Sequence, residues 1–243
     1  GHRISANGSH RRIVFIGNPN VGKSSLFNAI LGTKSRVMNA PGTTVLLEEG
    51  EYAHDGNTWD LIDTPGTYSL LPLSPDEKVA ADTVMGLDGE KNPDLIVTVL
   101  DATNLSRSLY FLAMVLELGK PTVVALTMND LARKQGAGID PKELSHTLGG
   151  VPVIEVNGRS GEGKRELMDM VGTHFSGTPL SSRERMAASR ELFRCSVSRL
   201  AASSALPALM TSTCHNGWRA MPTHDSTGPH TCFHSSICRH ATA

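Results

Sequence analysis

The chain has 243 residues, a formal net charge of −1 and 39% hydrophobic residues, which is typical of a soluble globular domain with an appendage. It contains no apolar run near the ~18 residues that a membrane-spanning helix needs. It also contains no apolar secretory segment at its start and no dense basic stretch of the kind that attracts nucleic acid. We therefore expect this chain by itself to be soluble and cytoplasmic, without a nucleic-acid partner.

Segments with strand character alternate along the chain with segments of helical spacing. The continuous apolar run 95–100 is typical of a parallel strand buried on both faces. Asp55-Gly56 is a hairpin signal between two strands, and Ser74 and Glu77 form a capping box at the start of a helix. This order predicts an α/β fold, with a mainly parallel six-stranded sheet, one antiparallel edge strand and helices on both faces. The expected elements are strand 13–16, helix 25–31, a mobile loop 33–44, strands 45–52 and 58–62, a helix from Pro75, strand 95–100, a helix from an Asn104 cap to Gly119, strand 121–126, a helix opened by an Asp140 capping box, strand 151–156 and helix 161–171.

Composition changes near residue 175. All four cysteines and six of the ten histidines lie after Val171, and every lysine lies before it. We place a disordered leader at 1–10, a folded domain at 11–173 and a poorly defined tail at 174–243, in which 181–201 could form one amphipathic helix.

The end of the tail carries two Cys-x-His pairs that could bind Zn²⁺. Their spacing fits no standard structural zinc site, and the low aliphatic content favours disorder or a non-native tail. The residues of the two pairs are Cys232, His234, Cys238 and His240.

Segment 17–24, GNPNVGKS, fits the phosphate-binding pattern G-x-x-x-x-G-K-[ST] and lies between a strand and a helix. Its glycines allow a tight turn in which consecutive N–H groups and a helix N-terminus face a polyphosphate. Lys23 then reaches the β- and γ-phosphates, and the Ser24 hydroxyl binds Mg²⁺. The alternative is a glycine-rich turn with an exposed lysine.

Two further segments offer groups to the same phosphates. Asp63 follows strand 58–62, so its carboxylate can hold Mg²⁺ directly or through water, while the Gly66 N–H can meet a γ-phosphate. Thr44 is the expected second hydroxyl on Mg²⁺ and closes the mobile loop when a γ-phosphate is present. A threonine that only starts a strand is the alternative.

Asp130 follows the buried strand 121–126 and is the candidate for base recognition. Its carboxylate is placed to accept hydrogen bonds from the N1–H and the exocyclic amine of guanine, a donor pair that adenine lacks. A helix-capping aspartate is the alternative. Asn157-Gly158 ends the last strand, where backbone N–H groups could meet the guanine oxygen.

These five elements, in this order and spacing, resemble a Ras-like GTPase of the translation-factor class. Finer features are similar to the cytosolic G domain of the ferrous iron transporter B family, and the likeness covers residues 11–172. The segments that carry it are 17–20 (GNPN), 39–45 (NAPGTTV), 63–70 (DTPGTYSL), 74–80 (SPDEKVA) and 160–163 (SGEG).

The chain departs from this pattern at three places. Thr127 stands where the family usually has asparagine, which weakens one link between the base and the phosphate loop. Asn157-Gly158 replaces the usual Ser-Ala. Thr67 lies where Ras-like enzymes carry a water-orienting glutamine, so catalysis needs a different device.

The resemblance also implies roles for single residues. Lys23, Asn20, Thr44 and Gly66 are the expected catalytic groups, and the Asn20 amide is expected to help hold a K⁺ ion that offsets developing charge. Mg²⁺ is expected on Ser24, Thr44 and Asp63. The expected guanine-nucleotide contacts are Asn18, Pro19, Asn20, Val21, Gly22, Lys23, Ser24, Ser25, Gly42, Thr43, Thr44, Asp63, Thr64, Pro65, Gly66, Thr127, Met128, Asp130, Asn157 and Gly158.

The sequence thus predicts a domain that binds GTP and slowly hydrolyses it to GDP. By resemblance, it serves ferrous iron transport at the cytoplasmic face of a bacterial inner membrane. Its expected partner is a membrane-embedded transport domain that this chain does not contain. Two alternatives stay open: a stand-alone GTPase acting on ribosomes or tRNA, and a non-enzymatic guanine-nucleotide sensor.

Overall fold

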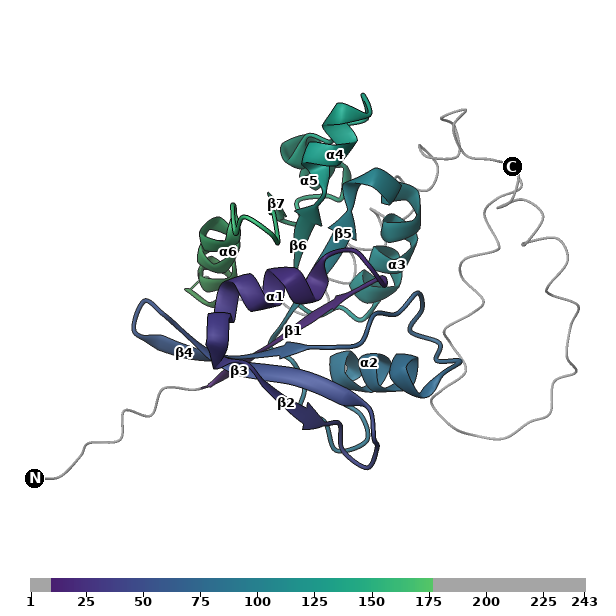
Figure 1. Cartoon of the computed structure of the whole chain (residues 1–243), viewed down its shortest axis with the longest axis vertical. Helices are drawn as coiled ribbons and strands as arrows, with labels where there is room; N and C mark the ends of the chain where they lie inside the picture. The colour runs from purple at the N-terminus through teal and green to yellow at the C-terminus, as the bar shows by residue number, and fades with distance from the viewer. Residues whose placement is uncertain (1–9, 177–243) are drawn as a thin grey trace, which may run out of the picture. The chain divides into compact units, whose positions relative to one another are not determined.

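The computed structural model describes residues 10–176, and its centre is one mixed seven-stranded sheet in the order β2-β3-β4-β1-β5-β6-β7 (Figure 1). The expectations for residues 1–9 and 177–243, including the helix at 181–201 and the Cys-x-His pairs, lie outside the described residues. The strands are β1 (Arg11–Gly17), β2 (Arg36–Asn39), β3 (Leu46–His54), β4 (Asn57–Asp63), β5 (Leu95–Asp101), β6 (Thr122–Thr127) and β7 (Val153–Glu155). The α-helices are α1 (Lys23–Leu31), α2 (Pro75–Met85), α3 (Leu105–Glu117), α4 (Asn129–Lys134), α5 (Pro141–Thr147) and α6 (Lys164–Ser176), and two short 3-10 turns are η1 (Gly32–Lys34) and η2 (Ala102–Asn104).

The α/β class and the mainly parallel sheet are confirmed, but the strand count is one higher than predicted. β4, β1, β5, β6 and β7 pair in parallel, and β3 is antiparallel to both β4 and β2. The additional strand β2 lies within the segment expected to be a mobile loop. The edge of the sheet is therefore β2, and β3, which was predicted to be the edge, lies between β2 and β4. All four residues of β2 are exposed. Its pairing with β3 therefore rests on backbone hydrogen bonds, and the apolar pattern of the sequence does not predict this strand.

The hairpin between β3 and β4 forms at the expected turn. Asp55 and Gly56 both have positive φ angles, 46° and 77°. Left-handed backbone at both central residues matches the twist of the flanking strands.

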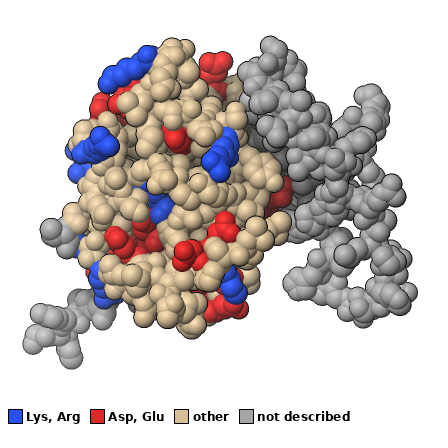
Figure 2. Space-filling view, turned by 45° about the vertical axis from the view of Figure 1, so that its right-hand side comes forward, with Lys and Arg blue, Asp and Glu red and all other residues tan. Residues whose placement is uncertain are grey.

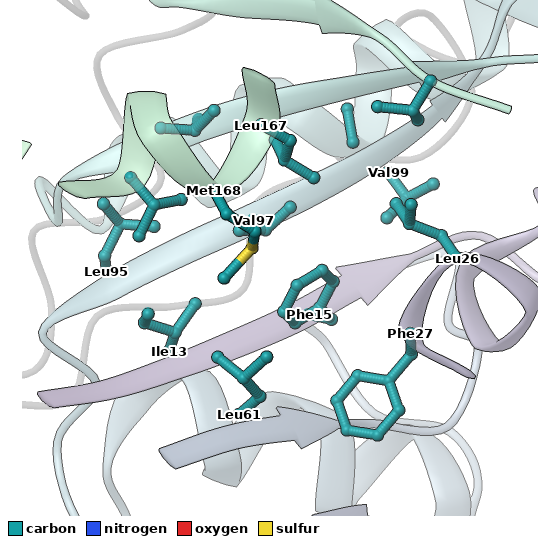
Figure 3. Close-up of a cluster of buried hydrophobic side chains, with 14 of the residues drawn as sticks. Ile13, Phe15, Leu26, Phe27, Leu61, Leu95, Val97, Val99, Leu167 and Met168 are labelled. Carbon is teal, nitrogen blue, oxygen red and sulfur yellow. The ribbon is translucent and has the colours of Figure 1, made fainter. Parts of the chain in front are cut away.

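Alternate residues of β1 face opposite layers of helices. Ile13 and Phe15 pack with α1 and α6, whereas Val14 and Ile16 pack with α2 and α3. Figure 3 shows the first of these clusters, in which the Phe15 and Phe27 rings meet edge-on with centroids 5.5 Å apart. A sheet covered on both faces places its loops at the two ends of the strands, and the carboxyl ends are where ligands bind in such folds.

Four helix ends differ from expectation in detail. At α5, Asp140 accepts from Lys142 N at 2.8 Å rather than from Glu143 N, so the predicted capping box is not formed. Ser74 Oγ accepts a hydrogen bond from Glu77 N at 3.2 Å, as expected, but the Glu77 carboxylate accepts from Leu73 N at 3.0 Å rather than from the cap residue. Asn104 makes no side-chain capping bond; instead Asp101 accepts from Thr103 N at 2.8 Å and opens η2, after which α3 begins. α6 begins at Lys164 and runs to Ser176, five residues beyond the predicted end.

α4 was not predicted. It has six residues, too few for a helical apolar period to stand out. Among the described helices, none is both long and apolar enough to cross a membrane.

Candidate functional site

The phosphate loop connects β1 to α1 at the carboxyl end of the sheet. Asn20 and Gly22 take left-handed φ angles of 65° and 83°, which bend the chain sharply ahead of Lys23. Within the described residues no side chain caps α1, and its first turn has no acidic residue. The first N–H groups of α1 are therefore suited to an anion.

Lys23 is buried beside the end of β4 rather than exposed as in a simple turn. Its ammonium group contacts both Asp63 Oδ1 and the Thr64 carbonyl, and its side chain is only 6% exposed. Ser24 Oγ donates to the other oxygen of Asp63 at 2.6 Å. The cause is the parallel register that pairs Phe15 with Asp63, which sets the carboxylate next to the phosphate loop.

The loop after β4 is hydrogen-bonded to the end of β1, where the phosphate loop begins. The Thr64 hydroxyl donates to Phe15 O at 2.9 Å, and Thr67 N donates to Gly17 O at 3.0 Å. A Cβ on Gly66 would lie 2.8 Å from Pro19 Cα, so this close approach requires glycine. Gly66 thus lies directly against the phosphate loop.

Thr67 cannot serve in place of a glutamine. It is fully buried, and its hydroxyl donates to Ser69 O at 2.7 Å. The Thr67 hydroxyl is therefore already bonded within its own loop.

The three expected Mg²⁺ ligands, Ser24, Thr44 and Asp63, line one cavity of about 690 Å³, together with Glu48 and Asp76. Hydroxyl and carboxylate oxygens are the ligands that Mg²⁺ prefers, and Ser24 and Asp63 already lie within hydrogen-bond distance of each other. The residues present therefore fit a magnesium ion.

The segment that carries Gly42, Thr43 and Thr44 forms an exposed turn beside that cavity. Ala40 N donates to Val45 O at 2.8 Å, Thr43 N donates to Ala40 O at 3.1 Å, and Gly42 has a φ of 68°. Backbone bonds close this turn, whereas the Thr44 side chain is exposed.

Two asparagines of the phosphate loop differ in their surroundings. Asn18 is 5% exposed, and its Oδ1 is without a hydrogen-bond partner among the described residues. Asn20 is exposed, and its left-handed backbone is by itself a reason for asparagine. A cation ligand and a turn-forming residue are therefore both compatible with Asn20.

Asp130 lies at the surface in the first turn of α4. The N-cap position belongs to Met128, with φ 57°, so Asp130 is not the helix cap that the alternative required. Its carboxylate is exposed beyond the end of β6, where a base can approach it.

A hydrogen-bond network centred on the buried Asn129, which the sequence did not predict, holds α4 in place. Asn129 is 1% exposed; its amide donates to Ile139 O at 2.7 Å and to the Glu155 carboxylate at 2.8 Å, and it accepts from Ile139 N at 2.8 Å. Arg133 binds the same carboxylate, and this contact, aided by Asn129, lowers the pKa of Glu155. No local pattern could have revealed it, because Glu155 lies 26 residues further along the chain.

The base end and the phosphate end of the site are joined at two points. Thr127 Oγ1 lies 2.7 Å from Val21 O, and a Cβ on Gly158 would lie 3.0 Å from Leu26 N and 3.2 Å from Ser25 Cβ. Asn157 Oδ1 accepts hydrogen bonds from the N–H groups of the next turn. The loops that carry the predicted site residues thus lie together at the carboxyl ends of the parallel strands.

A mainly parallel sheet with a phosphate loop after β1, an aspartate at the end of β4 and an exposed aspartate after β6 defines a P-loop GTPase, or G domain. The family model described as ferrous iron transport protein B (FeoB_N) matches residues 11–171. This chain belongs to that family.

Relatives and solved structures agree with this assignment. The Fe(2+) transport protein A/Fe(2+) transporter FeoB fusion protein of Porphyromonas gingivalis is 42% identical over 166 residues, which cover 68% of this chain and 19% of that protein. The Fe(2+) transporter FeoB of Salmonella typhimurium is 42% identical over 163 residues, covering 65% of this chain and 21% of that protein. This chain therefore spans about a fifth of the length of these curated relatives.

Among solved structures, the G domain of the T. maritima FeoB iron transporter is 42% identical with a TM-score of 0.62, covering 68% of this chain and 98% of that one. The cytosolic domain of the same transporter in its GMPPNP form has a TM-score of 0.64 and 42% identity, covering 70% of this chain and 66% of that one.

Proposed function

We propose that this chain binds GTP, hydrolyses it slowly to GDP, and thereby serves ferrous iron transport. The proposal of nucleotide binding rests on the buried Lys23, whose ammonium group contacts Asp63 and the Thr64 carbonyl. Ser24 Oγ donates a hydrogen bond to the same Asp63 carboxylate. A buried ammonium group needs a counter-charge. Phosphates of a bound nucleotide can take the place of Asp63, which frees its carboxylate for a metal.

Binding and orientation then follow from the chain's own groups. The N–H groups at the start of α1 hold the phosphates, Lys23 reaches the β- and γ-phosphates, and the Gly66 N–H meets the γ-phosphate. Magnesium, when bound by Ser24, Thr44 and Asp63, would supply positive charge beside the phosphates. Thr44 lies on an exposed turn and closes on the nucleotide only when a γ-phosphate is present.

Water attacks the γ-phosphorus, the bond from that phosphorus to the β–γ bridging oxygen breaks, and GDP and inorganic phosphate leave. Lys23 and the loop N–H groups stabilise the negative charge that develops on the phosphate oxygens. Thr67 is unavailable to orient water, so we assign the remaining assistance to the Asn20 amide oxygen, which would hold K⁺.

The link to iron rests on the relatives, which are named Fe(2+) transporters and are about five times as long as the matched segment. We infer that a membrane-embedded transport domain is the partner and that the G domain works at the cytoplasmic face of a bacterial inner membrane. On the face that Figure 2 shows, basic and acidic side chains are interspersed among the described residues, which favours this assignment over a GTPase that binds ribosomal RNA.

The test is a switch in base preference at Asp130. Asp130→Asn replaces two acceptors by one acceptor and one donor, the complement of xanthine, so calorimetry should show weaker GDP binding and stronger binding of xanthosine diphosphate. Asp169→Asn, an exposed aspartate on α6, is the control and should keep the parent's preference for GDP. Unchanged GDP affinity of Asp130→Asn would contradict the assignment of this loop.

A further inference from the structure

The ring of Tyr68, two residues after Gly66, lies against the start of helix α3. The guanidinium carbon of Arg107 is 4.0 Å from the centroid of this ring. That distance is well inside the ~6 Å limit of a cation–π contact, in which the negative face of the ring attracts the cation. Both side chains are exposed, Tyr68 to 40%. Arg107 therefore connects α3 to the loop that carries Gly66.

The position of Arg107 within α3 is not explained by the helix itself. Arg107 lies in the first turn of α3, and this turn holds no acidic residue. The N-terminus of a helix carries partial positive charge, which favours acidic side chains there and disfavours basic ones. The helix dipole therefore does not account for an arginine at this position, whereas the Tyr68 ring offers it a negative face.

The first turn of α3 is a fixed support for this contact. Asp101 N, at the end of β5, donates a hydrogen bond to Ser108 Oγ at 3.2 Å, and Ser108 is only 2% exposed. One turn further along, Phe111 is buried in the core between the sheet and its helices. Because Arg107 directly precedes Ser108, the sheet determines where its backbone lies.

The loop on the other side of the contact is held on both sides of Tyr68. Thr67 N donates to Gly17 O at 3.0 Å, and the Leu70 side chain is buried among residues of α2 and α3. Between these two points, the ring of Tyr68 meets Arg107. Only Thr67 separates Tyr68 from Gly66, which lies against the phosphate loop. A shift of the ring therefore changes where the Gly66 N–H points.

We infer that Arg107 is a positioning residue for the γ-phosphate, because its contact with Tyr68 keeps the Gly66 N–H beside the phosphate loop. This inference deepens the proposed function and rests on it. Arg107 acts through Tyr68 and not by touching the nucleotide. GDP lacks the γ-phosphate, so the contact favours binding of GTP and is indifferent to GDP.

The test compares the affinities for GDP and for GMPPNP, measured by calorimetry with Mg²⁺ on the full chain. Arg107→Ala and Tyr68→Leu each remove one partner, and each should weaken GMPPNP binding by about two- to fivefold, the effect of one exposed cation–π contact, with GDP binding unchanged. Tyr68→Phe keeps the ring face and should bind both nucleotides like the parent. The double variant should lose no more than either single variant, because both residues act through one contact. Arg165→Ala is the control, since Arg165 lies on α6 with its side chain 91% exposed.

Four results would overturn the inference. They are unchanged GMPPNP binding by Arg107→Ala, equal weakening of GDP and GMPPNP binding, tighter GMPPNP binding by this variant, and losses that add in the double variant. If Arg107→Ala does not fold, the two Tyr68 variants decide, and equal GMPPNP binding by Tyr68→Phe and Tyr68→Leu overturns the inference. A parent that binds neither nucleotide contradicts the proposed function itself, and the inference with it.

Discussion

The Lys23–Asp63 pair leads to a prediction about the nucleotide-free protein. Both side chains are buried, with exposed fractions of 6% and 5%, and the ammonium group also contacts the Thr64 carbonyl. Asp63→Asn removes the counter-charge and leaves the volume nearly unchanged. Breaking one side of a buried ion pair costs about 3–5 kcal/mol. We expect the lower end, about 3 kcal/mol, because the amide oxygen can still accept from Lys23.

A domain of this size loses roughly 2–4 °C in melting temperature per kcal/mol. Asp63→Asn should therefore melt about 6–12 °C below the parent, measured by circular dichroism in EDTA without nucleotide. Saturating GDP should reduce the difference, because its phosphates supply the missing negative charge to Lys23.

The matched control is Asp60→Asn, on the same strand. Asp60 is 40% exposed and meets only the exposed His10 ring, at 3.3 Å, in the described part of the chain. Its replacement should change the unfolding free energy by no more than about 0.5 kcal/mol. If Asp63→Asn melts within about 2 °C of the parent, the buried pair does not stabilise this domain and the reasoning fails.

Three further predictions follow from other parts of the chain. GTP turnover should be faster in K⁺ than in Na⁺, and both Asn20→Ala and Asn20→Gly should abolish this difference. Asn20→Gly keeps the left-handed turn, so if this variant still turns over GTP faster in K⁺, the Asn20 side chain serves only the backbone conformation. The lowered pKa of Glu155 means that its ionised form stabilises the fold above the unfolded pKa near 4.5 and that this contribution is lost as the pH falls through the folded value. Denaturant unfolding should therefore show Glu155→Gln less stable than the parent at pH 7, with a difference that shrinks well below pH 4.5; a pH-independent difference would contradict the charge argument. A chain shortened after Ser176 should keep the parent's melting temperature and GDP affinity, because the aliphatic-poor tail cannot bury enough apolar surface to offset its ordering entropy. A large loss in the melting temperature or in the GDP affinity would show that the tail packs on the domain.

Much of the fold is encoded locally and was predicted for that reason. The buried run that became β5 is short, β-branched and apolar at nearly every position, which is typical of a strand covered on both faces. The Asp55-Gly56 turn needs two left-handed residues, and the Ser74–Glu77 cap needs a hydroxyl three residues before an N–H group. Each of these signals lies within a few residues, and the phosphate loop is of the same kind.

Other features depend on residues that only the folded chain brings together. β2 is exposed at all four positions, so its place at the edge is decided by backbone pairing with β3 and not by side-chain pattern. The Asn129–Glu155 bond joins the ends of β6 and β7, which the parallel register sets side by side.

The same holds for the hydrogen bond between Thr127 and the phosphate loop. The sequence by itself determined that threonine stands at position 127, where the family usually has asparagine. Only the tertiary structure decided where its hydroxyl goes, because Val21 O lies 106 residues away along the chain and reaches Thr127 through the packing of β1, β5 and β6. A hydrogen bond between such distant segments has no local signature, since its geometry is set by the whole sheet.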